Sequence, residues 1–187
     1  MERGLRIRRV GFGKKGQFYL IAAIILATII IGISVVVNYS KKQDSGNLEN
    51  LKEELQIESE NVLDYGAFHR FNDAQMKSLL TDFSEDYITV KGDNKNLYFI
   101  FGKEGTDSLK VVASQTLKET AEISGVANGE VLDITPGIVF ERSYTPSGNQ
   151  IDLIVNDFTH EFVLEEGENF YFLISQEIGG GVYVTKN

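Results

Sequence analysis

The sequence contains no cysteine and no tryptophan, and only two prolines and two histidines among its 187 residues. Without cysteine the chain can form no disulfide scaffold, no cysteine-ligated zinc site and no thiol catalyst. Hydrophobic residues still make up 42% of the chain, and twelve phenylalanines and eight tyrosines supply apolar volume for a folded core. The length accommodates one membrane or targeting element and one domain of ordinary size.

Charge is absent from one long stretch and is divided unevenly around it. Residues 1–16 contain six basic residues and one acidic residue, whereas residues 17–40 contain no charged residue. Residues 41–187 contain twelve basic and 26 acidic residues, a net charge of −14 within a chain total of −9. Such an acidic body repels phosphate groups, so the sequence predicts no nucleic-acid partner.

The uncharged stretch contains an apolar run from Phe18 to Tyr39. As a helix rising about 1.5 Å per residue, this run would extend roughly 33 Å, which matches the hydrocarbon core of a bilayer. The sequence therefore predicts a transmembrane helix over residues 17–40. The basic residues before it predict a cytoplasmic N-terminus and an external body in a single-pass membrane protein.

The outer end of the run argues against its removal as a secretory signal peptide. Such peptides have about 7 to 15 apolar residues and end in small side chains, whereas this run is longer and ends in the bulky segment Val35–Tyr39. We therefore expect the mature protein to retain it. Asn38-Tyr39-Ser40 is a glycosylation sequon, but its position at the membrane boundary favours an unmodified Asn38.

The junction between leader and apolar run reads Lys14-Lys15-Gly16-Gln17. A basic leader, a glycine and an apolar helix that begins at once resemble the class III signal sequence of archaeal type IV pilin-like proteins. The resemblance covers about the first 40 residues. It implies that a prepilin-type peptidase cuts between Gly16 and Gln17 on the cytoplasmic side and leaves the apolar helix on the mature subunit.

Small residues recur at four-residue spacing within the apolar run. Ala23 and Ala27 form one such pair, and Thr28 and Gly32 form another. Small residues at this spacing let transmembrane helices approach closely. They predict contacts with copies of the chain or with other pilin-like subunits, in addition to the lipid bilayer.

Residues 41–46 read as a polar linker, and residues 47–187 read as an extracytoplasmic α+β head. An apolar stripe predicts an amphipathic helix from Leu48 to about Tyr65 that packs under its own domain rather than in a coiled coil. The stripe consists of Leu48, Leu51, Leu55, Val62 and Tyr65.

A second short helix is expected to begin at Asn72, because Gln75 three residues later completes a capping box. Its inward-facing residues would be Met76, Leu79, Leu80 and Phe83.

From Asp86 onward the pattern changes to short alternating segments joined by turn residues, which predicts an antiparallel β-sandwich or barrel-like head. The turns include Asn156-Asp157. The expected strands are Tyr87–Lys91, Leu97–Gly102, Leu109–Ser114, Leu117–Ile123, Glu130–Ile134, Ile138–Ser143, Gln150–Val155, Phe158–Leu164, Asn169–Ile178 and Val182–Thr185.

The two histidines do not indicate catalysis. His160-Glu161 begins like H-E-x-x-H, but position 164 is leucine and the segment alternates like a strand, so His160 reads as a residue at the edge of the core. His69 reads as a packing or hydrogen-bonding residue between the helices. The letters G-x-G-x-x-G over residues 11–16 precede a membrane segment rather than a soluble helix. We expect no enzyme activity, no cofactor and no metal site.

Two functions from different classes remain open. The first is a cell-surface structural protein, similar to a type IV pilin-like subunit, whose head is exposed for assembly or adhesion. A surface filament is one form that such an assembly can take. The alternative is an uncleaved single-pass membrane protein that presents a β-sandwich ligand-binding module. The two differ in whether the bond between Gly16 and Gln17 is cut.

Overall fold

The computed structural model describes residues 47–103, 108–178 and 180–187. The predicted leader, transmembrane helix and linker lie outside the described residues. So do the predicted site residues Lys14, Lys15, Gly16, Gln17, Ala23, Ala27, Thr28 and Gly32. Among the described helices, none is both long enough and apolar enough to cross a membrane. The chain divides into compact units between Gln43 and Asp44, and the unit Asp44–Asn187 contains every described residue.

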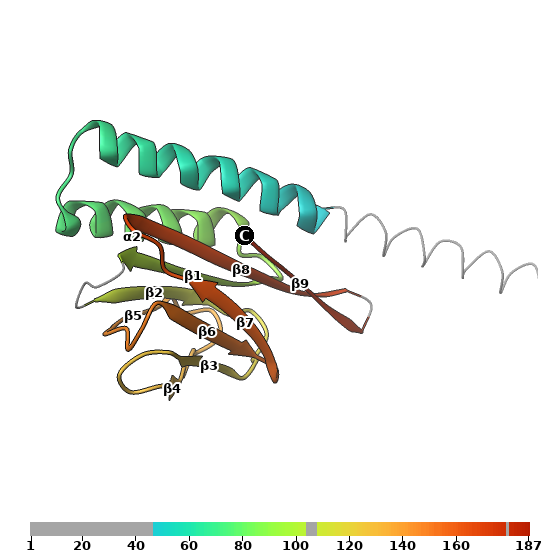
Figure 1. Ribbon diagram of the computed structural model, residues 1–187. Helices are drawn as coiled ribbons and strands as arrows, with labels where there is room; N and C mark the ends of the chain where they lie inside the picture. Colours follow the sequence, from blue (N-terminus) through green and yellow to red (C-terminus); the bar gives the residue numbers. More distant parts are fainter. Residues whose placement is uncertain (1–46, 104–107, 179) are drawn as a thin grey trace, which may run out of the picture. The chain divides into compact units, whose positions relative to one another are not determined.

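The described residues form two helices followed by two antiparallel sheets (Figure 1). The first helix covers residues 47–68, and α2 covers Asp73–Lys91. The strands are β1 (Asn96–Lys103), β2 (Leu109–Ser114), β3 (Ala121–Ser124), β4 (Glu130–Val131), β5 (Phe140–Tyr144), β6 (Gln150–Val155), β7 (Phe158–Val163), β8 (Glu168–Ile178) and β9 (Gly181–Lys186). The strand order is β5-β2-β1-β8-β9 in one sheet and β4-β3-β6-β7 in the other. The expected α+β class is confirmed, and the described strands form two open sheets rather than one closed barrel.

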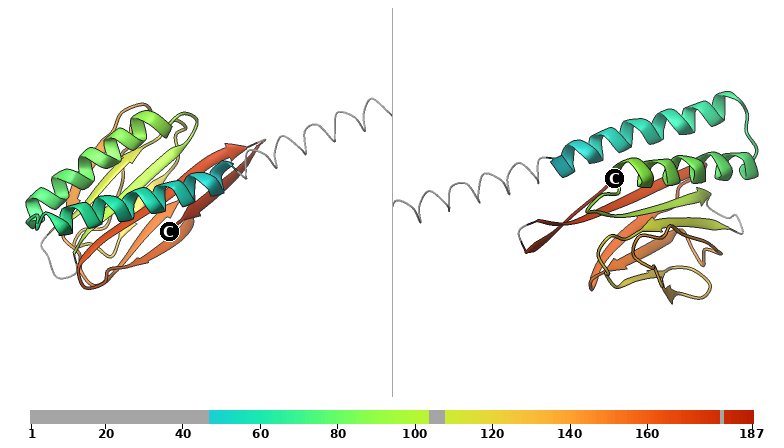
Figure 2. Two further views of the ribbon diagram at one scale, coloured as in Figure 1. Left: turned by 90° about the horizontal axis from the view of Figure 1, so that it is seen from above. Right: turned by 180° about the vertical axis from the view of Figure 1, so that it is seen from behind.

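The five-stranded sheet is the middle of three layers, with the helices on one face and the four-stranded sheet on the other (Figure 2). Its central strand β1 explains the arrangement. Leu97, Phe99 and Phe101 pack in one core cluster with the helices, whereas Tyr98 and Ile100 pack in a second cluster with the four-stranded sheet. A strand covered on both faces needs an unbroken apolar run, which is what β1 has.

The capping box at the start of α2 is confirmed. The Asn72 side chain accepts a hydrogen bond from the Gln75 N–H, and the Gln75 side chain accepts one from the Asn72 N–H, each at 3.0 Å. The predicted strand Tyr87–Lys91 is wrong, because these residues form the last turns of α2. The β-rich part therefore begins at Asn96 rather than near Asp86. Tyr87 and Ile88 are buried in the helix-side core, and the stability gained there exceeds the small strand preference of β-branched residues.

The first helix packs on its own domain, as expected. Leu48, Leu51 and Leu55 are buried in the same core cluster as α2 and the five-stranded sheet. The inward placement of Tyr65 is wrong, because this side chain is 51% exposed. Gly66 faces α2 instead, and a Cβ there would lie 2.4 Å from Cε of Met76, so glycine permits the close approach of the two helices.

Most expected strands are present, and two have the predicted bounds, β2 and β6. The strand expected from Leu117 begins only at Ala121. The Asn96 side chain explains the difference, because it accepts hydrogen bonds from the N–H groups of Thr116 and Leu117 and donates one to the Leu117 carbonyl. These bonds hold the preceding residues in a loop.

The division at Asp44 leads to a prediction about the isolated head. A fragment of residues 47–187 contains both core clusters and is long enough to bury a core. It should be soluble, unfold cooperatively without metal or cofactor, and sediment as a monomer. Circular dichroism and analytical ultracentrifugation at micromolar concentration test this. Stable oligomers would place an assembly interface in the head.

Candidate functional site

The described part of the chain contains no cluster of three or more histidine, aspartate or glutamate side chains that could hold a metal ion. Three features stand out: an exposed group of aromatic side chains, a groove between the helices, and a polar network at the start of α2.

The side chain with the largest exposed fraction among the large apolar residues, Phe68, belongs to the aromatic tip, defined as Tyr65, Phe68, His69 and Phe71 at the end of the first helix and in the connection that follows it. Phe68 is 84% exposed and Tyr65 is 51% exposed. The His69 ring lies 4.1 Å from the Tyr65 ring and 5.2 Å from the Phe68 ring, measured between centroids. These rings therefore form one continuous surface.

Local backbone geometry fixes the aromatic tip. The chain leaves the first helix through Arg70, which has a positive φ of 54°, and the Phe71 N–H donates to the Gly66 carbonyl at 3.0 Å. Nδ1 of His69 lies 2.9 Å from the Tyr65 carbonyl oxygen, so the predicted hydrogen-bonding role of His69 is confirmed. A fixed cluster of exposed aromatic rings offers a partner apolar area at low cost in side-chain entropy.

The aromatic tip lies at the end of the head opposite residue 47. The first helix runs along the whole head (Figure 1), and at about 1.5 Å per residue its described residues extend roughly 33 Å. The tip is thus presented far from the point where the head begins.

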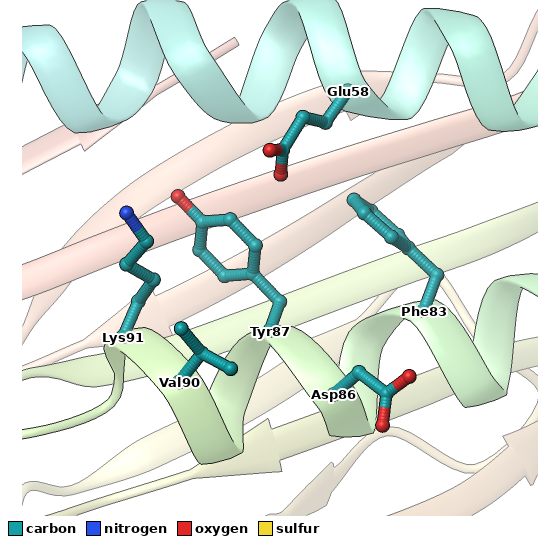
Figure 3. Close-up of a pocket in the computed structure, with 6 residues that line it drawn as sticks. All are labelled: Glu58, Phe83, Asp86, Tyr87, Val90 and Lys91. Atoms are coloured by element: carbon teal, nitrogen blue, oxygen red, sulfur yellow. The ribbon is translucent and has the colours of Figure 1, made fainter.

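A groove of about 200 Å³ lies between the first helix and α2 (Figure 3). Tyr87 points from α2 toward the first helix, and its hydroxyl donates to the Leu51 carbonyl at 3.4 Å. Burial, and then the charges of Glu54 and Glu58, raise the pKa of Tyr87. Lys91 forms an ion pair with Glu54 at 2.7 Å, and this hydrogen bond raises the pKa of Lys91. These contacts join the two helices, so we interpret the groove as part of the packing interface between them.

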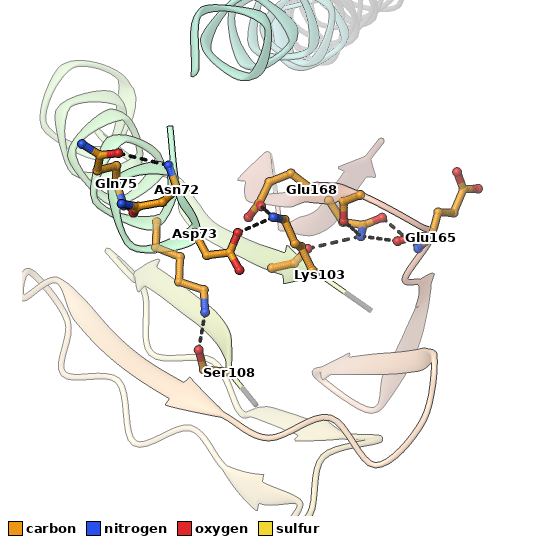
Figure 4. A network of polar contacts seen from close by, with 11 residues as sticks. Asn72, Asp73, Gln75, Lys103, Ser108, Glu165 and Glu168 are labelled. Carbon is orange, nitrogen blue, oxygen red and sulfur yellow. Dashed lines mark hydrogen bonds and ion pairs between the residues drawn. The ribbon is translucent and has the colours of Figure 1, made fainter. Parts of the chain in front are cut away.

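The polar network ties the start of α2 to the ends of β1 and β8 (Figure 4). Lys103 forms an ion pair with Asp73 and a longer one with Glu168 at 3.7 Å. The hydrogen bond from Lys103 lowers the pKa of Asp73. Oε1 of Glu168 is buried and has no hydrogen-bond partner within the described ranges, and burial raises the pKa of Glu168 despite Lys103 and Lys77 nearby.

The raised pKa of Glu168 predicts a pH-dependent contribution to stability. The folded state holds the proton more tightly than the unfolded state, whose glutamates titrate near pH 4.5. As pH rises from below 4.5 through the raised pKa of Glu168, the free energy of unfolding of wild type should therefore fall relative to that of Glu168→Gln. Above that pKa the difference between the two proteins should stay constant. Urea unfolding at a series of pH values measures this. A constant difference across the whole series would show that Glu168 titrates normally in the folded head.

His160 lies on β7 opposite Leu153 of β6. His160 is half-buried, and Phe162 and Leu164, two and four residues later, are buried, which agrees with a residue at the edge of the core. Phe158, two residues earlier, is 70% exposed. The sheets therefore do not cover this end of β7.

The structure thus brings together residues that the sequence did not single out as a site. The predicted processing and helix-contact residues lie outside the described residues. The aromatic tip combines Tyr65, which was assigned to the apolar stripe of the first helix, with a connector whose His69 was read as a packing or hydrogen-bonding residue. The sequence Phe68-His69-Arg70-Phe71 was its one available signal. No protein-family model, curated protein or solved structure matches the chain. Its function must therefore be inferred from its own residues.

Proposed function

We propose that this chain is a membrane-anchored structural protein of the cell surface, processed like a type IV pilin-like subunit, with a head exposed for assembly or adhesion. The observation that carries the proposal is the order of the N-terminal segments. A basic leader ends in Lys14-Lys15-Gly16, and an uncharged run over residues 17–40 follows directly. A separate compact unit begins at Asp44.

The head supports a role in contact rather than in chemistry. Its polar clusters are paired in ways that fix the helices and strands, as at Lys91 and Lys103. Its most exposed aromatic side chain, Phe68, lies in the aromatic tip, at the end remote from residue 47. The exposed aromatic tip offers apolar area for contact with a neighbouring subunit or a surface.

The proposed partners follow from the same segments. The bilayer holds residues 17–40, a prepilin-type peptidase recognises the boundary at Gly16, and the small residues Ala23, Ala27, Thr28 and Gly32 contact copies of the chain or other pilin-like subunits. The leader stays in the cytoplasm and the head lies outside.

Intact-mass measurement of the protein from its native membrane tests the proposal. A mature chain that begins at Gln17 supports a processed subunit. A chain that begins at Met1 contradicts it and favours the alternative, an uncleaved single-pass protein whose head binds a ligand.

A further inference from the structure

A cleft of about 320 Å³ opens between the edges of the two sheets. Phe158 and His160 of β7 line one wall, Val182 and Val184 of β9 line the other, and Val155 at the end of β6 contributes to the lining as well. We call this the β7/β9 cleft. Its lining is mainly apolar, which is unusual for a surface that faces water.

Phe158, Val182 and Val184 of the β7/β9 cleft lie on inward strand faces but are exposed. Phe158 and His160 share a strand face with Phe162, which is buried. Val182 and Val184 share a face with Lys186, whose ammonium lies 4.9 Å from the centroid of the Phe162 ring. At that end the sheets are joined, and Nζ of Lys186 also donates to the Glu161 carbonyl at 2.7 Å.

At the other end the two sheets leave apolar side chains exposed. Phe158 is 70% exposed and Val182 is 53% exposed. Each occupies a position that strand alternation assigns to a core. The head therefore has an unfilled core position at this end.

One residue that lines the cleft has a polar atom without a hydrogen-bond partner. Nε2 of His160 is buried and makes no hydrogen bond to any described residue. Burial, and then the charge of Lys186, lower the pKa of His160, so the imidazole is neutral at pH 7. A buried ring nitrogen of this kind costs stability until a ligand supplies a hydrogen bond.

Main-chain groups distinguish the type of ligand. Among the described strands, β9 pairs with β8 alone and β7 pairs with β6 alone, so each has one edge without a neighbouring strand. β9 contains no proline, and its one charged residue is Lys186 at its end, so it lacks the usual protection of an edge strand. An extended polypeptide can form hydrogen bonds with the unpaired main-chain N–H and C=O groups of such an edge, whereas a small apolar molecule cannot.

Charge argues against a second copy of the chain as the occupant. Asp157, next to Phe158, and Glu177, opposite Val182 on β8, are exposed. The ammonium of Lys186 donates to the main-chain carbonyl of Glu161 and lies over the Phe162 ring. Two copies paired through this edge would bring these carboxylates together, whereas a segment with basic side chains would complement them.

We propose that the β7/β9 cleft binds an extended segment of another protein, which adds as a strand to the edge of β9. Its alternate apolar side chains fill the space between Phe158 and Val184, one polar group forms a hydrogen bond with Nε2 of His160, and Lys or Arg residues flank it. This binding requires only the folded head and is independent of cleavage at Gly16.

A peptide selection tests the proposal. Random peptides about ten residues long, the size of one added strand, are selected for binding to the full-length protein in phosphatidylcholine nanodiscs. The bound sequences should alternate apolar and polar residues and carry Lys or Arg near their ends. Binding should slow amide hydrogen exchange in β9 and shift the NMR signals of the His160 ring.

Two variants and one control assign the bound peptides to the cleft. Val184→Glu and Phe158→Ser change opposite walls, and each should weaken binding about tenfold or more, because a buried unpaired carboxylate or a lost apolar contact is costly. Val131→Glu alters a 66% exposed valine on β4 and should leave binding unchanged.

Three outcomes overturn the proposal. The first is a selection that yields no alternating sequences, or sequences whose binding ignores both wall variants. The second is a dimer of the full-length protein that Val184→Glu dissociates, which makes a second copy the occupant. The third is that phenol or indole shifts the NMR signals of His160 and that no selected peptide displaces it, which makes the cleft a small-molecule site.

Discussion

Gly16→Val should abolish maturation, so that the protein from the native membrane keeps residues 1–16 and begins at Met1. The peptidase must receive an extended segment at its cleft, and a residue without a Cβ can enter where the branched valine side chain collides. The basic leader and the apolar run are unchanged in this variant, so membrane insertion should be retained. The expected effect is the complete loss of the mature mass.

Gly13→Val is the matched control for this prediction. It makes the same exchange in the same leader, three residues before the proposed boundary. Its mature mass should equal that of wild type, since residue 13 is removed with the leader. If Gly16→Val also matures to the wild-type mass, the proposed processing site is wrong.

Leu55→Ala should lower the free energy of unfolding of the head by about 2–5 kcal/mol, the usual cost of emptying a buried leucine site. Leu55 of the first helix is fully buried in the core cluster that this helix forms with α2 and the five-stranded sheet. A loss of this size is a large part of the stability of a domain. Urea unfolding of residues 47–187, followed by circular dichroism, measures it.

Ile57→Ala is the control on the same helix. Ile57 is 61% exposed, so its truncation should change stability by no more than about 0.5 kcal/mol. Equal effects of the two substitutions would mean that the first helix does not pack on the head in solution through its Leu55 side.

Short-range features were predictable because the residues that decide them are close in sequence. The capping box of α2 depends on Asn72 and Gln75 alone. The turn between β6 and β7 depends on Asn156 and Asp157, which have φ values of 49° and 68° and tolerate this conformation better than most residues. The apolar run over residues 17–40 is likewise a property of sequence alone, and its membrane role remains a prediction.

Features that depend on distant contacts were not predictable. The end of α2 has β-branched residues, and it stays helical because Tyr87 and Ile88 pack in the helix-side core and Lys91 pairs with Glu54. The loop before β3 is held by Asn96, about twenty residues earlier in the chain. Local preferences of a few tenths of a kcal/mol yield to such contacts.

The sequence by itself determined the α+β class, the start of α2 and most of the strands, because periodicity and capping are local. Only the tertiary structure decided which apolar residues are covered. Tyr65 and Phe158 fit inward-facing patterns, yet both are exposed. A pattern specifies the face of an element, but burial also requires another element opposite that face. The packing of the helices leaves Tyr65 in the aromatic tip, and the opening between β7 and β9 leaves Phe158 uncovered.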